Sequence, residues 1–395
     1  MNLDQSVVDL LTYFEIDQKT GFLIADPLIK LPEAFEQWHQ ISDNCHHILL
    51  DNMEQLIAQK LLNHRIEQLP VISTDSLTSN KELRLAHLLL VTLAAGYIWQ
   101  DGLDKARLSV PASISIPLLE VCKRLSFKPI ACHASVCLAN WRPIRESESF
   151  DAAAADIIAF RFVQHPGNRW FFTLTAQIEA ELAEALCAIA SACWRGEIEQ
   201  STMLHITNAV KTATATMKRM EDYVPPDVFY HGFRIFLSGY TTKPMVEQGG
   251  IIFEGRQDLG PQLLNGGSAA QSSTFHVIDG FLGIKHSYHV EEFLALQREY
   301  MPPKHRDFIL WVRQSAAKIL NLKYATGYYR AVQAVRKFRE SHIKMESIST
   351  YCVEKFIVLP AEDNCELGTG GSSFMDLLKS IASDCQHNQS RLTPM

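Results

Sequence analysis

The chain has 395 residues, of which 47% are hydrophobic and 21% are charged, so it can bury a large core. Its formal net charge is −7 and it has no dense run of lysine and arginine, which argues against a nucleic-acid partner because duplex binding needs a basic face. The nine cysteines form no Cys-x-x-Cys pair, so we expect neither a disulfide framework nor a zinc ribbon, and we predict a reducing, cytoplasmic location.

The N-terminal part shows neither a signal peptide nor a membrane span. The first residues lack a basic segment ahead of an apolar one, as a signal peptide would require. The most apolar stretch, residues 85–99, is too short to span a bilayer, and it carries His87 between Arg84 and Gln100. We therefore predict that these residues form a helix buried in the protein core, and we expect no association of the protein with a membrane.

Helical periodicity dominates the rest of the chain, and clean alternating strands are scarce, so the fold class is predicted to be all-α. The polar, unpatterned residues 142–151 are typical of a linker. They divide the chain into a small, mostly helical N-terminal domain (residues 1–145) and a large helical domain (residues 146–395). One helical stripe in the large domain consists of Leu174, Ile178, Leu182, Ile189 and Cys193.

A second helix is predicted over residues 324–352, with His342 on its apolar stripe beside Phe338 and Met345. An imidazole in such a place could ligate a haem iron, with the apolar neighbours covering the porphyrin. A core histidine bonded to a backbone carbonyl would show the same spacing. No Cys-x-x-Cys-His sequence occurs, so any haem would be bound non-covalently.

Another helix is expected to begin near Asp227, after Pro225 and Pro226. It carries Arg234 among aromatic side chains, and a guanidinium in apolar surroundings needs an anion. That anion could be a substrate carboxylate held by two hydrogen bonds, or a structural aspartate or glutamate. The aromatic side chains are Phe229, Phe233 and Phe236.

Two glycine-rich loops cover residues 265–268 and 368–373. Neither has the Gly-Lys-Ser/Thr ending of a P-loop or the Gly-x-Gly-x-x-Gly pattern, so nucleotide binding is disfavoured. The second loop could be a mobile flap or a plain surface turn. Arg339, three residues before His342, could bind a haem propionate, a neighbouring carboxylate such as Asp279, or solvent.

Together these segments resemble the indoleamine 2,3-dioxygenase family, and we expect a bacterial-type member. The resemblance spans about residues 80–380 and rests on motifs that follow in the family's order. They are residues 81–87 (KELRLAH), 137–141 (CLANW), 229–239 (FYHGFRIFLSG), 266–273 (GGSAAQSS), 300–306 (YMPPKHR), 339–342 (RESH) and 368–371 (GTGG).

The resemblance implies a large helical domain that holds haem b, capped by the smaller domain. It implies that His342 is the proximal iron ligand. The implied reaction inserts both atoms of O2 across the C2=C3 bond of the indole of tryptophan, which gives N-formylkynurenine. The implied partners are L-tryptophan or another indole, O2 and an unidentified reductant.

The resemblance also assigns individual residues. Thr175 falls where the family has a distal serine, and with Ser268 it is a candidate catalytic hydroxyl whose modest role is a hydrogen bond to the bound gas, since a hydroxyl titrates too high to be a base. Residues implied to contact haem are Gly267, Ser268, Ala269, Asp279 and Arg339. Residues implied to contact substrate are Arg234, Phe229, Tyr230, Phe171, His133 and Thr369.

Two residues depart from the family's pattern. His133 stands where mammalian members have a tyrosine at the rim of the pocket, and Tyr230 replaces a phenylalanine. Both add polarity near the substrate, so a haem dioxygenase acting on a different indole is one alternative. A non-enzymatic haem protein that binds a diatomic gas is another, although a gas needs no carboxylate-binding arginine.

Overall fold

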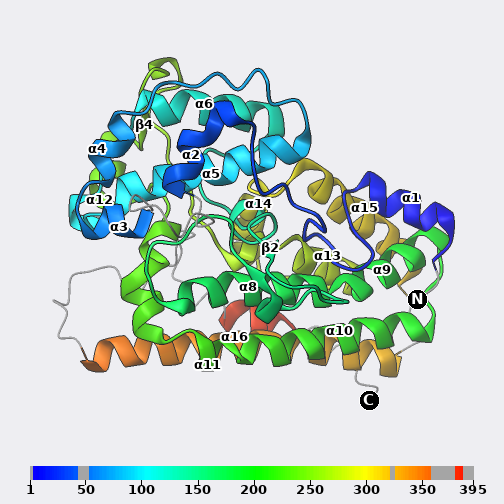
Figure 1. The fold of residues 1–395 in the computed structure, drawn as a ribbon. Coiled ribbons are helices and arrows are strands. Elements are labelled where there is room, and N and C mark those ends of the chain that lie inside the picture. Colours follow the sequence, from blue (N-terminus) through cyan, green and yellow to red (C-terminus); the bar gives the residue numbers. More distant parts are fainter. Residues whose placement is uncertain (1–2, 43–52, 321–324, 357–378, 386–395) are drawn as a thin grey trace.

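The computed structural model describes residues 3–42, 53–320, 325–356 and 379–385. The described part is mostly helical, which confirms the predicted fold class, and its few strands have two residues each. The helices form two layers, an upper one built from N-terminal residues and a lower one that contains the longest helices (Figure 1).

The upper layer is centred on α5 (Asn80–Trp99), whose N-terminus is closed by a capping box in which the Ser79 side chain and Glu82 each accept from the other's backbone N–H. The helix is apolar on almost every face, which is typical of a buried helix. By length and composition α5 could cross a membrane, but 94% of its most apolar window is buried inside the protein. The predicted core helix is therefore confirmed. Around it lie α2 (Glu36–Ser42), α3 (Met53–Ala58), α4 (Leu62–Glu67) and α6 (Ala112–Leu125).

The lower layer rests on α16 (Ala325–Phe356), which runs beside α10 (Gln200–Lys218) along the base of the molecule (Figure 1). The helix expected over residues 324–352 is thus confirmed. The other helices of this layer are α8 (Pro166–Glu181), α9 (Ala183–Arg195), α11 (Met220–Tyr223), α13 (Ser273–Leu282), α14 (Tyr288–Arg298) and α15 (Pro303–Ile319).

Two predicted helices differ in detail. The stripe that begins at Leu174 is buried as expected, but Leu182 separates α8 from α9, because its N–H bonds to the Glu179 carbonyl three residues back. The helix expected near Asp227 is a π-helix, Val228–Phe233, followed by a 3-10 helix, Arg234–Leu237. π-Helical turns are rare and often occur at functional sites.

The two layers share parts of the chain. The short strand β1 (Ser109–Val110) pairs in parallel with β4 (Ile252–Phe253), so a segment of the second half joins the upper layer, together with α12 (Lys243–Gln248). Conversely, α1 (Gln5–Tyr13) packs on α9 in the lower layer. Within the predicted linker, β2 (Arg142–Pro143) pairs with β3 (Ala155–Asp156). A division at residue 145 stays a prediction.

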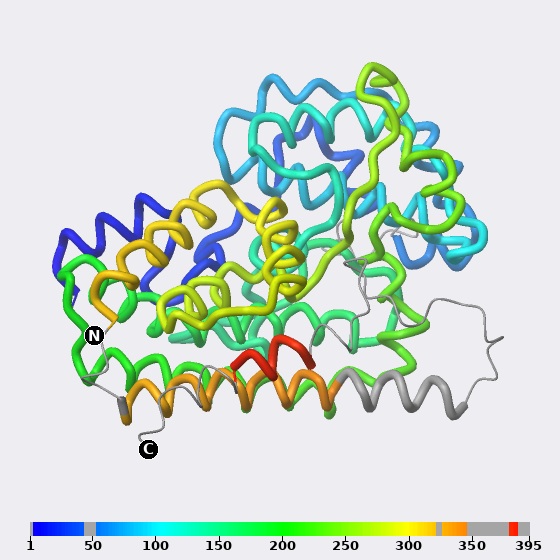
Figure 2. The backbone as a smooth tube through the Cα atoms, turned by 180° about the vertical axis from the view of Figure 1, so that it is seen from behind, coloured from blue at the N-terminus to red at the C-terminus, as the bar shows by residue number. Residues whose placement is uncertain are grey.

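A C-terminal segment, residues 379–385, lies against α16, as Figure 2 shows in red. Ile381 in this segment packs with Val290 and Leu294 of α14. Its Cys385 thiol accepts a hydrogen bond from Arg339 of α16. Residues 379–385 are therefore attached to the helix that carries His342.

Candidate functional site

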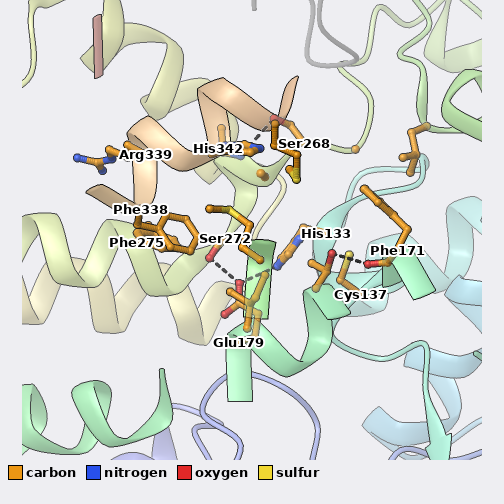
Figure 3. A pocket seen from close by; sticks show the side chains of 18 of the residues that line it. His133, Cys137, Phe171, Glu179, Ser268, Ser272, Phe275, Phe338, Arg339 and His342 are labelled. Carbon is orange, nitrogen blue, oxygen red and sulfur yellow. Dashed lines mark hydrogen bonds and ion pairs between the residues drawn. The ribbon is translucent and has the colours of Figure 1, made fainter. Parts of the chain in front are cut away.

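A cavity of about 240 Å³ lies between the long helices of the lower layer and α7 (His133–Val136). Side chains from α7, α8, α13 and α16 line it (Figure 3). Its walls are mainly apolar, with a few polar groups that point inward, which is the usual character of a small-molecule site. Apolar lining residues include Phe171, Phe172, Met217, Leu237, Phe275 and Phe338.

The cavity brings together most of the residues selected from the sequence. Tyr230 is not among the lining residues and instead contacts Arg234. Thr369 lies outside the described residues. The selected residues that line the cavity are His133, Phe171, Thr175, Phe229, Arg234, Gly267, Ser268, Ala269, Asp279, Arg339 and His342.

His342 projects from α16 into this cavity, near the apolar rings of Phe275 and Phe338, whose centroids are 4.5 Å apart (Figure 3). Desolvation by the surrounding protein lowers the pKa of His342 to about 4. The imidazole is therefore neutral at physiological pH, which is the form that binds a metal ion. His342 therefore presents a neutral imidazole to the cavity beside two apolar rings, and its role as an iron ligand stays a prediction.

Asp279 of α13 and Arg339 of α16 form the polar support expected from the sequence, because they make a buried ion pair of 2.6 Å. Arg339 also donates to the Cys385 thiol, and His286 bridges Asp279 (3.0 Å) and Asp384 (3.3 Å). Burial alone would raise the pKa of Asp279, but the nearby Arg339 and His286 charges hold it well below its ordinary value. Of the partners considered for Arg339, the structure shows the carboxylate of Asp279.

Arg234 lies over the ring of Tyr230, with its guanidinium carbon 4.9 Å from the ring centroid. It begins the 3-10 helix that follows the π-helix carrying Phe229. The Phe229 ring lies 4.9 Å from that of Phe171. A cation and two aromatic rings therefore line one cavity, and they come from three helices, which are α8, the π-helix and the 3-10 helix.

The two candidate catalytic hydroxyls have local partners. Thr175 donates to the Phe171 carbonyl one turn earlier at 2.7 Å, so its oxygen is left to accept rather than donate. Ser268 caps the short 3-10 helix Ala269–Gln271 by accepting from the Ala270 N–H at 3.2 Å. Both side chains line the cavity, and a hydrogen-bonding role for either stays a prediction.

The loop before Ser268 needs glycine for close packing. A Cβ at Gly266 would overlap the Leu237 carbonyl oxygen, and the Gly267 N–H bonds to that oxygen at 2.9 Å. The loop is thereby pinned against the 3-10 helix that begins at Arg234. This contact fixes the position of Ser268 at the cavity wall.

His133, expected at the rim of the pocket, lines the cavity and is only 4% exposed, and its contact with a substrate stays a prediction. Its Nε2 lies 2.9 Å from the buried carboxylate of Glu179. Burial alone would raise the pKa of Glu179, but hydrogen bonds from His133, Ser272 and Thr274 lower it. The short helix α7, which begins at His133, packs on α5.

Glu179 and Cys137 were missed by the sequence reasoning although both line the cavity. A signal for Glu179 existed, because Phe171, Thr175 and Glu179 are spaced four residues apart and so share one face of α8. Cys137 lies one turn after His133 and would have followed from the same argument. A carboxylate on the same helical face as two predicted cavity residues is therefore a sequence signal for a further residue of the site.

The structure is that of a helical protein with an apolar cavity, lined by a neutral histidine and a buried ion pair, of the kind that binds small molecules. The model of the family described as Indoleamine 2,3-dioxygenase matches residues 10–388. The chain therefore belongs to the indoleamine 2,3-dioxygenase family, whose proteins bind haem.

Individual relatives cover nearly the whole chain. Indoleamine 2,3-dioxygenase 1 of Mus musculus is 32% identical over 388 residues, which cover 93% of this chain and 92% of the relative. Indoleamine 2,3-dioxygenase acdA of Aspergillus candidus is 32% identical over 403 residues (94% and 95%). A protein named Myoglobin from Haliotis madaka is 27% identical over 397 residues (96% and 98%). These relatives are animal and fungal, so they give no support to the expected bacterial type.

The residues present fit a haem. His342 offers a neutral imidazole, and Phe275 and Phe338 offer apolar faces beside it. The imidazole and the apolar walls therefore agree with the group that the family binds.

Asp279→Asn should lower the free energy of unfolding by about 3–5 kcal/mol, because Arg339 would stay buried without its anion. Urea denaturation measures the change. The difference from the unsubstituted protein should be fully present above about pH 4, the ordinary carboxyl pKa, and shrink as the pH falls through the lowered pKa of Asp279.

Asp26→Asn is the matched control, since Asp26 makes an exposed ion pair of 2.7 Å with Lys81. Its denaturation midpoint should equal that of the unsubstituted protein. Equal effects of both substitutions would contradict a structural role for the buried pair.

Proposed function

We propose that this protein is a cytoplasmic haem-dependent dioxygenase that converts L-tryptophan to N-formylkynurenine with an external reductant. The observation that carries the proposal is that His342 and Arg234 line one cavity together with Phe171 and Phe229. An iron ligand, a carboxylate-binding cation and two aromatic rings are what haem chemistry on an aromatic amino acid requires. The family match adds support.

In this proposal each residue has a limited task. Haem b, held non-covalently through His342, would supply the iron that activates dioxygen. Arg234 would bind the substrate carboxylate by two hydrogen bonds, and the rings of Phe171 and Phe229 would hold the indole. Thr175 would accept rather than donate a hydrogen bond, since its proton is bonded to the Phe171 carbonyl.

The apolar walls of the cavity would exclude water from the substrate. A dry cavity strengthens the interaction of Arg234 with an anion and keeps the indole in one orientation. The Asp279–Arg339 pair would act only by holding α16 in place. The carbon chemistry belongs to the cofactor and the substrate.

A second candidate function is gas binding without catalysis, which the relatives named Myoglobin from Haliotis madaka and Haliotis diversicolor favour. A narrower alternative is a dioxygenase for another indole, since the polar His133 lines the cavity and Tyr230 contacts Arg234. In both alternatives the protein binds haem, and only the second ligand in the cavity differs: a diatomic gas alone in the first, or an indole other than tryptophan in the second.

Incubation of the reduced, haem-loaded protein with L-tryptophan and O2 should yield a product with the mass of tryptophan plus two oxygen atoms. Mass spectrometry of the product and the absorption spectrum of the protein are the measurements. Turnover of another indole alone would favour the narrower alternative. A stable oxygenated spectrum, unchanged by any indole and without product, would favour gas binding.

His342→Ala should abolish the Soret band or sharply weaken haem retention, because no imidazole would remain at that place on α16. Titration with hemin followed by gel filtration measures retention. His205→Ala, at a partly exposed histidine of α10 that bonds Glu184, is the control. Full haem occupancy with unchanged ligation in His342→Ala would refute the assignment.

Arg234→Ala should reduce kcat/KM for tryptophan by about 2–5 kcal/mol in transition-state free energy, as expected for a buried charged contact. The loss for the decarboxylated substrate, tryptamine, should be far smaller. Steady-state kinetics with both substrates are the measurement, and Arg195→Ala, at a surface arginine of α9, is the control. Equal losses for both substrates would count against a carboxylate contact.

A further inference from the structure

The side chain of Gln271 lies behind the cavity wall rather than in its lining. Gln271 is the last residue of the short 3-10 helix Ala269–Gln271, and only 2% of it is exposed. A buried amide is unfavourable unless its polar atoms find hydrogen-bond partners, because burial removes the water that would otherwise bond them. The partners of this amide therefore show which segments it connects.

Three hydrogen bonds pair the Gln271 amide. Its Oε1 accepts from the His133 backbone N–H at 3.0 Å. Its Nε2 donates to the Gly266 carbonyl at 2.9 Å and to Gln297 Oε1 at 3.0 Å. A backbone N–H can only donate and a carbonyl can only accept, so these partners determine which end of the amide carries the oxygen. Both hydrogens of the amide nitrogen are used, and the side chain is held in one orientation.

Gln271 holds the glycine loop at two points that enclose Ser268. The side chain bonds the Gly266 carbonyl, and the Gln271 backbone N–H bonds the Ser268 carbonyl at 3.0 Å. Leu237 holds the same loop through a separate contact, because its carbonyl accepts from the Gly267 N–H at 2.9 Å. The position of Ser268 at the cavity wall therefore depends on Gln271 as well as on Leu237.

The same amide connects the loop to α7. His133 is the first residue of α7, and the first N–H groups of a helix have no partner within that helix. The Oε1 of Gln271, 138 residues further along the chain, accepts from this N–H. One side chain thus joins the segment that places His133 in the cavity wall to the loop that places Ser268 there.

The helix α14 supports this arrangement through two residues that do not line the cavity. Gln297 is fully buried and accepts one of the two hydrogen bonds from Gln271 Nε2. Tyr300 accepts from the Asn265 N–H at 2.7 Å with its hydroxyl oxygen, directly before the glycine loop. Gln297 therefore belongs to the same network as Gln271 but makes none of the bonds that join the loop to α7.

We propose that Gln271 is a positioning residue of the site, which fixes Ser268 and His133 relative to each other at the cavity wall. Gln271 acts through the loop and through α7, and its side chain contacts neither substrate nor cofactor. The inference rests on the haem that the family binds and, for the effect on turnover alone, on the proposed dioxygenase function.

Gln271→Met tests the proposal in the full-length, haem-loaded protein, because methionine has a similar length but cannot pair the three groups that the amide pairs. Carbon monoxide is the probe, and its infrared stretching band is the readout, since polar groups of the pocket act on a gas bound at the haem. We expect the band to shift or to split, because the two segments are no longer fixed to each other. If the proposed reaction holds, kcat/KM for L-tryptophan should also fall by up to about 100-fold.

Gln297→Met is the matched control. It removes one hydrogen bond from the same network at an equally buried position, but it leaves the bonds from Gln271 to His133 and Gly266. Both substitutions should lower the free energy of unfolding in urea, since each leaves a buried polar group unpaired. The carbon monoxide band of Gln297→Met should nevertheless equal that of the unsubstituted protein, so the band separates positioning from a purely structural role.

Gln271→Glu is the second variant if Gln271→Met does not fold, which circular dichroism checks. At about pH 8, well above the ordinary carboxyl pKa of about 4.3, it keeps an oxygen for the His133 N–H but has no donor for the Gly266 carbonyl, so its band should also shift or split. An unchanged band in a folded Gln271 variant, or an equal change in Gln297→Met, would overturn the proposal. A changed band without any product from tryptophan would support the positioning role and contradict only the dioxygenase function.

Discussion

The ion pair between Asp279 and Arg339 is the interaction on which the site depends. It joins α13 to α16 at a distance of 2.6 Å, in surroundings where an unpaired charge would be strongly unfavourable. His342 lies one helical turn after Arg339, so the position of the pair sets the position of the imidazole. Residues 379–385 add Cys385 and Asp384 to the same network, and Ile381 of this segment lines the cavity.

The opposite side of the cavity is shaped by irregular backbone. A π-helix places Phe229, a 3-10 helix begins at Arg234, and the glycine loop packs so closely on Leu237 that a side chain at Gly266 would not fit. Regular helices could not bring these residues to one surface, because each turn would rotate some of them away. The α-helices thus supply His342 and Phe171, and the irregular segments supply Arg234 and Phe229.

The sequence predicted most of the helices and much of the cavity lining. Periodicity was sufficient for α16 and for the burial of α5, because an apolar stripe or an apolar helix must face a core. It could not predict the break at Leu182 or the π-helix, since both arise from tertiary packing and from a change in hydrogen-bond partner rather than from residue type.

The polar part of the site was harder to predict. His133 was expected near the substrate, but its partner Glu179 was not expected, because another helix contributes it 46 residues further along the chain. Nothing local in the sequence reports such a pairing. The Asp279–Arg339 pair is 60 residues apart but was anticipated, because the resemblance already placed both residues near His342. A local sequence pattern can predict helices, but a side-chain pair between residues that are distant in the sequence can be identified only from the three-dimensional structure.

The parallel pairing of β1 with β4 has a consequence for how the molecule could be divided. Ser109 and Val110 find their partners at Ile252 and Phe253, more than half-way along the chain. A fragment that stopped at residue 145 would leave β1 without its partner strand, and the remaining fragment would expose the surface of α9 that α1 covers. A cut at this point would therefore break contacts in both layers.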